Sequence, residues 1–172
     1  MTKPVRTATA DLFVGYGHFS VTDYDADIPE LGPAYANGLV GVDSGGAAVL
    51  TGTATGKVTV TLQVLHAEPG SIELDGWDEV SEVSLDSEEG FILVHNTMVG
   101  PPRELDEIAY VGPGTYRVRV HARGRDIAPH SHAETPQEHY LISVWPAPEA
   151  PATVHKQTDR FGHEVRTQWK KP

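Results

Sequence analysis

The chain of 172 residues carries 24 acidic and 13 basic side chains, giving a formal net charge of −11, and it contains no cysteine. The absence of cysteine excludes disulfide scaffolds, thiolate zinc sites, iron–sulfur clusters and cysteine nucleophiles. No apolar run approaches the roughly 20 residues that cross a bilayer, and the first residues lack the apolar core of a secretory signal. The sequence therefore predicts a soluble, cytoplasmic globular domain with no membrane partner.

Short apolar stretches of period two dominate the chain and predict β-strands. In chain order, the expected strands span residues 12–21, 38–43, 46–53, 58–64, 71–74, 91–94, 116–120 and 140–145. The run 91–94 is apolar throughout, which indicates a strand covered on both faces. Residues 29–37 are compatible with one or two helical turns, and no longer window keeps a helical apolar stripe.

Gly-Gly, Pro-Gly and other turn signals separate these stretches at short intervals. Many short strands with such turns predict an all-β fold, a single antiparallel β-sandwich of jelly-roll or C2-like type, over residues 1–146. Three prolines follow within residues 146–151, and proline cannot donate to a sheet ladder. Residues 147–172 are therefore expected to form a Pro-rich linker and an irregular basic tail, either disordered or packed on the acidic body.

The charge is unevenly distributed along the chain. Residues 1–150 hold 22 acidic and eight basic side chains, whereas residues 151–172 carry an excess of three positive charges. Such an acidic field repels phosphate, so direct nucleic-acid binding is disfavoured and a basic protein is the expected partner; solubility alone explains the same field. The expected binding surface is the acidic connection that carries Asp75, Asp78, Glu79, Glu82, Asp86, Glu88 and Glu89.

Histidines cluster late in the sequence, at His130, His132 and His139. Together with Glu138 they could form a metal site, and Gly124 stands where the cupin metal motif begins. The cupin glutamate position and the second cupin motif do not match, and prolines flank the histidines. A polar loop is therefore favoured, and the alternative is a metal-dependent cupin-like β-barrel enzyme or a small-ligand-binding protein.

Two further charged patterns alternate along extended segments. The first is a basic stripe, for which cross-strand ion pairs on the solvent side of a sheet are favoured over an anion site: Arg117, Arg119, His121 and Arg123. The second does not fit the EF-hand spacing and indicates a solvated turn: Asp23, Asp25 and Asp27. No serine elbow, phosphate loop or dinucleotide fingerprint is present, so the sequence predicts neither catalytic residues nor a cofactor.

The segment LFVGYGHFSV, residues 12–21, resembles the first strand of the competence protein J family of DNA-entry nuclease inhibitors. A Gly-rich pair of strands at residues 38–50 and 57–65 follows, as in that family. The similar order continues to residue 146 through an acidic connection and the strands at 90–94, 115–120 and 140–145. The resemblance implies a small β-sandwich that binds and inhibits a nuclease through an acidic surface. The Pro-rich tail and the histidine loop depart from the family pattern.

The function expected from these observations is a non-catalytic, immunity-type binding module. Its partner is expected to be a basic protein such as a nuclease or toxin, held through the acidic connection described above. Electrostatic attraction would make that association depend strongly on salt.

Overall fold

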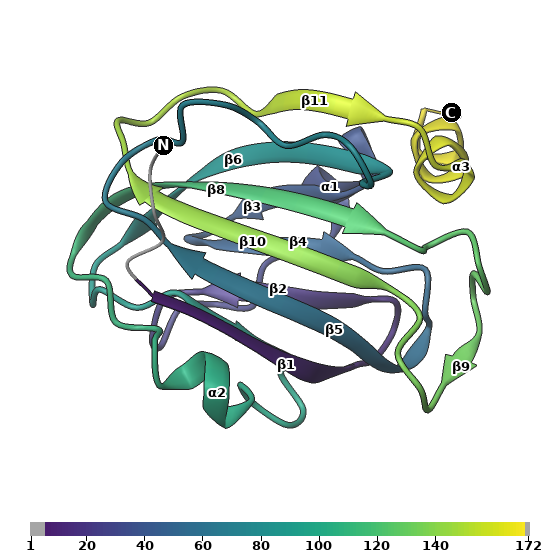
Figure 1. Cartoon of the computed structure of the whole chain (residues 1–172), viewed down its shortest axis with the longest axis horizontal. Helices are drawn as coiled ribbons and strands as arrows, with labels where there is room; N and C mark the ends of the chain where they lie inside the picture. The colour runs from purple at the N-terminus through teal and green to yellow at the C-terminus, as the bar shows by residue number, and fades with distance from the viewer. Residues whose placement is uncertain (1–5, 171–172) are drawn as a thin grey trace.

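The computed structural model describes residues 6–170, which form two packed β-sheets (Figure 1). The strands of the larger sheet are β1 (Arg6–Val14), β5 (Thr55–Val64), β6 (Glu79–Ser87), β8 (Gly114–Arg123), β9 (His132–Ala133), β10 (His139–Pro146) and β11 (Thr153–Gln157). They run in the order β1-β5-β10-β8-β6-β11, with β9 beside β5. The smaller sheet, in the order β3-β4-β2-β7, contains β2 (His18–Thr22), β3 (Val40–Asp43), β4 (Gly46–Leu50) and β7 (Leu93–His95). This architecture confirms the all-β sandwich.

The core lies between the two sheets and follows from the period-two pattern. Along β5, Val58, Val60 and Leu62 are fully buried, while Thr59 and Thr61 between them face outward and are half-buried. Strand β5 pairs with β1 in antiparallel fashion but with β10 in parallel, so the larger sheet is mixed rather than purely antiparallel. The long crossover that a parallel pair needs is supplied by the chain between β5 and β10, which includes β6 and β8.

Several expected strand boundaries require correction. The single strand expected over residues 12–21 is split between β1 and β2, which belong to different sheets, since the chain turns at Tyr16 and Gly17 with φ of 56° and 71°. Residues 71–74 form no strand, and the run 91–94 contributes only the short β7, whose Leu93 is half-buried rather than covered. The helical turns expected within residues 29–37 are present as α1 (Gly32–Asn37).

Strand β6 lies inside the acidic segment that the sequence presents as a connection. It pairs with β8 over its whole length, from Glu79 opposite Ala122 to Ser87 opposite Gly114. The acidic residues before and after β6 therefore lie at opposite ends of the sandwich, about 30 Å apart for a nine-residue strand.

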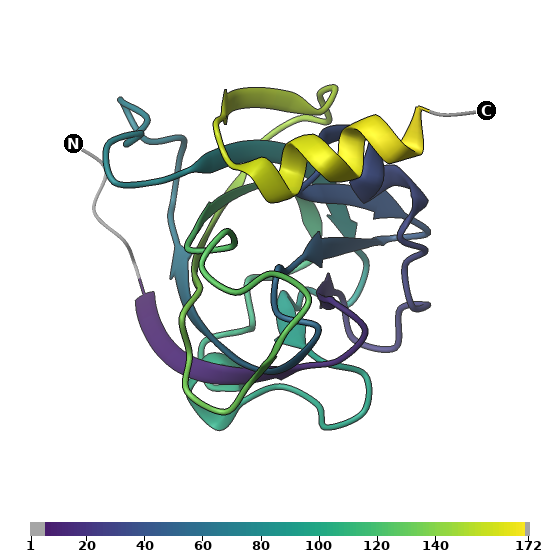
Figure 2. The same ribbon diagram turned by 90° about the vertical axis from the view of Figure 1, so that its right-hand side faces the viewer.

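The tail packs on the sandwich in regular structure, so the expectation of an irregular tail was wrong. Strand β11 pairs with β6 and extends the larger sheet. Helix α3 (Arg160–Trp169) then crosses one end of the sandwich beside α1 (Figure 2). Asp159 caps α3 by accepting a hydrogen bond from the N–H of Gly162. Neither α3, α1 nor the short α2 (Arg103–Asp106) has the length and apolar character of a membrane span.

Candidate functional site

The seven acidic residues expected to bind a partner do not form one surface. Asp86, Glu88 and Glu89 are exposed beyond or near the end of β6, whereas Asp75 is exposed before its start. Asp78 is half-buried and accepts a hydrogen bond from the backbone N–H of Gly124. Glu79 and Glu82, on β6 itself, are only 1% and 5% exposed. These two carboxylates are therefore unavailable to a partner, which corrects part of the expected surface.

Glu82 is the centre of a buried ion-pair cluster on the outer side of the larger sheet. Nε of Arg117 lies 2.7 Å from one of its carboxylate oxygens, and Nη2 of Arg119 lies 3.1 Å from the other, which also bonds to His155 on β11. Burial alone would raise the pKa of Glu82, but the hydrogen bonds from Arg117 and His155 and the charges of Arg119 and Arg117 hold it below its usual value. The expected cross-strand pairing is thus present for Arg117 and Arg119, but it is buried beneath the tail instead of facing solvent.

Glu79 belongs to a second buried cluster, which ties α3 to the sandwich. The fully buried Arg125 makes two hydrogen bonds of 2.7 and 2.9 Å to Asp159, and Arg166 donates to Glu79 at 2.9 Å. Burial and the nearby charge of Asp159 raise the pKa of Glu79. Residue 162 must be glycine in this packing, because a Cβ there would stand 2.7 Å from a carboxylate oxygen of Asp159 and 2.7 Å from one of Glu79. These acidic residues therefore serve the fold of the tail.

The three acidic residues at the end of β6, Asp86, Glu88 and Glu89, meet others in a groove at one end of the sandwich. This acidic groove, about 540 Å³ in volume, is formed by the loop after β2, the β3–β4 turn and the connection after β6. Its carboxylates come from segments some sixty residues apart: Asp23, Asp25, Asp27, Asp86, Glu88 and Glu89. The three aspartates that resembled a solvated turn thus join three of the seven residues of the expected acidic connection.

Asp23 holds the groove together from within. Its carboxylate, 6% exposed, accepts hydrogen bonds from the backbone N–H groups of Tyr24, Glu89 and Phe91 at 2.8 to 3.0 Å. Burial acts to raise the pKa of Asp23, but these three donors outweigh it and lower the pKa. Because the carboxylate stays ionised, the loop after β2 and the connection after β6 are fixed relative to one another.

Aromatic rings border the acidic groove. The ring of Phe91 lies between those of Tyr24 and Tyr110, at centroid distances of 5.8 and 5.2 Å. The two tyrosines are 55% and 56% exposed. Carboxylates pair with guanidinium and ammonium groups, and exposed ring faces attract the same cations. The groove and its border therefore present the side chains that suit lysine and arginine of a partner.

The histidine cluster is not brought together as a metal site. Glu138 is 2% exposed, and its carboxylate accepts hydrogen bonds from the backbone N–H groups of Gly52 and Thr53 and from the hydroxyl of Tyr140. The ring of His130 instead packs at 5.6 Å from Phe161. Within residues 6–170, no group of three or more histidine and carboxylate side chains is arranged to hold a metal ion, which includes the expected set His130, His132, His139 and Glu138.

Comparison with known proteins supports the fold. No protein-family model and no curated protein sequence matches the chain. Among solved structures, it is similar to the crystal structure of ComJ from Bacillus subtilis, an inhibitor of the DNA degrading activity of NucA, with 15% identity and a TM-score of 0.60 over 86% of this chain and 99% of ComJ. The structure of crocagin biosynthetic gene J is similar at 16% identity and a TM-score of 0.53, over 83% of this chain and 98% of the other. The chain therefore has a ComJ-like fold, as the sequence resemblance implied.

Proposed function

We propose that the chain is a non-catalytic binding module that inhibits a nuclease. The observation that carries this proposal is the fold, which matches 99% of the length of ComJ, an inhibitor of the DNA degrading activity of NucA. Fold alone does not determine function, so the proposal also needs a surface suited to such a partner. The acidic groove with its aromatic border supplies that surface.

The charge of the groove favours a basic protein over a nucleic acid. Asp25, Asp27, Asp86, Glu88 and Glu89 are all exposed, and within residues 6–170 no lysine, arginine or histidine lines the groove. A nuclease binds the DNA backbone through positive side chains, and the same side chains would meet these carboxylates. Occupation of the partner's DNA-binding surface would then prevent cleavage, with no chemistry required of this chain.

The proposal is tested by capture and inhibition together. The chain is immobilised and exposed to lysate of its source cells at about 50 and about 500 mM salt, since screening weakens exposed ion pairs at the higher concentration. Proteins retained only at low salt are purified and assayed for DNA degradation with and without the free chain. We expect a basic nuclease whose activity falls as the chain is added. A retained nuclease whose activity is unchanged at saturation contradicts inhibition, and the absence of any salt-sensitive partner contradicts the basic-partner proposal.

A further inference from the structure

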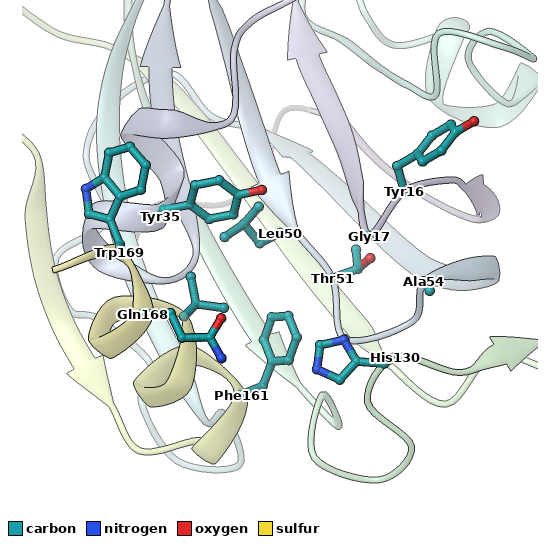
Figure 3. Close-up of a pocket in the computed structure, with 12 residues that line it drawn as sticks. Tyr16, Gly17, Tyr35, Leu50, Thr51, Ala54, His130, Phe161, Gln168 and Trp169 are labelled. Atoms are coloured by element: carbon teal, nitrogen blue, oxygen red, sulfur yellow. The ribbon is translucent and has the colours of Figure 1, made fainter. Parts of the chain in front are cut away.

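A second cavity lies at the end of the sandwich opposite the acidic groove, with α3 and α1 on one side and the β1–β2 turn on the other (Figure 3). It has a volume of about 420 Å³, within the range of small-molecule sites. We call it the aromatic cleft, because rings line it from four separate parts of the chain: Tyr16, Tyr35, His130, Phe161 and Trp169.

Helix α3 builds one wall of the aromatic cleft. Phe161, Val165 and Trp169 follow one another at intervals of four residues and so lie on one face of the helix. Phe161 is buried beneath the guanidinium of Arg125, which lies 4.9 Å from the ring centroid and fixes the floor of the cleft. Trp169 is 53% exposed and packs at 5.5 Å from the ring of Tyr35 on α1. The tail therefore completes a cavity that the sandwich alone does not form.

The opposite wall holds two side chains in backbone conformations that L-residues rarely adopt. Tyr16 has φ of 56° in the β1–β2 turn, and His130 has φ of 62°. Asparagine and glycine occupy this conformation at lower cost. Tyr16 is nevertheless 86% exposed, so packing within the fold does not explain why an aromatic side chain occupies this position. Strained positions of this kind gather at binding sites.

The chemistry of the lining defines the ligand. None of the twelve lining residues is an aspartate, glutamate, lysine or arginine, although 22% of the chain is charged. Among the described residues, none forms a hydrogen bond with the Tyr16 or Tyr35 hydroxyl or with the Gln168 side-chain amide. Aromatic walls favour stacked or edge-on rings, and the few polar groups would orient them. We propose that the aromatic cleft binds an uncharged small molecule with a planar aromatic ring, which would bridge α3 and the sandwich.

The test uses indole as the probe, because it is planar, uncharged and carries one hydrogen-bond donor. The backbone amide resonances and the tryptophan side-chain N–H resonances of the full chain are followed by NMR during the titration. Cyclohexanol, a saturated and non-planar ring, serves as the control ligand. We expect saturable shifts centred on Trp169 and the lining residues, with a dissociation constant of about 1 mM or tighter. Shifts elsewhere, no saturation, or equal binding of cyclohexanol would overturn the proposal.

Matched variants locate the binding. Tyr16→Ala and Trp169→Ala each remove one exposed ring of the cleft, whereas Tyr24→Ala removes a ring about as exposed as that of Trp169 at the far end of the sandwich. We expect each cleft variant to weaken indole binding about 3- to 10-fold and Tyr24→Ala to leave it unchanged. Equal effects of all three would contradict the assignment. So would a wild-type dimer that Trp169→Ala converts to a monomer, because a second copy would then cover the cleft.

Discussion

Arg125 is the residue on which docking of the tail depends most directly. Its guanidinium is completely buried and donates to both carboxylate oxygens of Asp159, to the carbonyl oxygen of Gly38 at 2.8 Å and to that of Leu50 at 3.2 Å. Replacement Arg125→Met keeps an apolar stem in the site but leaves the Asp159 and Glu79 carboxylates without this cation. Removing one partner of a buried ion pair costs about 3 to 5 kcal/mol. We therefore expect a loss of that size in the free energy of unfolding.

Urea unfolding followed by circular dichroism measures this loss as a shift in the midpoint at constant slope. The matched control is Arg103→Met, because the Arg103 side chain is 86% exposed and its pair with Glu107 contributes roughly 0.5 kcal/mol or less. The double variant Arg125→Met with Asp159→Asn removes the orphaned charge and is expected to recover part of the stability. A loss below about 1 kcal/mol for Arg125→Met, or strictly additive losses in the double variant, would refute this account.

Three further predictions concern the buried histidine, the helix α1 contact and the start of α3. Burial, opposed by a hydrogen bond to a backbone carbonyl, lowers the pKa of His121 to about 4. As the pH falls below about 6.5, this imidazole is protonated in the unfolded chain before it is protonated in the folded chain. The free energy of unfolding should therefore fall by about 3 kcal/mol between pH 6.5 and pH 4. Thermal unfolding should show a weaker dependence of the melting temperature on pH between 6.5 and 4 for His121→Leu, whereas His163→Gln, at an exposed site, should leave that dependence unchanged. Equal pH dependence of the two variants would contradict the role of His121. A Cβ at Gly41 would overlap the backbone of α1, so Gly41→Ala should lower the melting temperature by several degrees, whereas Gly70→Ala, in open space, should not. The Asp126 carboxylate accepts hydrogen bonds from the first two N–H groups of α3, at 2.8 Å each. Asp126→Ala should therefore lower the free energy of unfolding by about 1 kcal/mol and speed trypsin cleavage within α3 about fivefold. An unchanged cleavage rate would count against this cap.

The sandwich could be predicted from sequence where one face of a strand is apolar. Strand β5 alternates in sequence and its burial follows that alternation, whereas β8 alternates in sequence but is buried on both faces from Tyr116 to Ala122. Strand β6 is hidden because Glu79 and Glu82 interrupt its pattern. Their burial depends on arginines that are distant in sequence, such as Arg117 and Arg125, and no local pattern reveals such partners.

The tail and the acidic groove mark a different limit. The four-residue spacing of Phe161, Val165 and Trp169 after the N-cap Asp159 is a helix pattern in the sequence. It is easily missed because the tail holds few apolar residues. The groove carries no such signal, because Asp25 and its neighbours meet the connection after β6 only once the sheets have packed. Sequence could identify the acidic residues but not which of them share one end of the sandwich.

The most direct test of the account compares charge removal at the two ends of the sandwich. The groove variant combines Asp86→Asn, Glu88→Gln and Glu89→Gln, and its control removes the same charge from other exposed sites, with Asp75→Asn, Glu134→Gln and Glu164→Gln. Affinity for the captured nuclease is measured for both at about 50 mM salt. We expect at least about tenfold weaker binding by the groove variant and little change in the control. Equal affinities of the two variants would contradict the acidic groove as the binding surface.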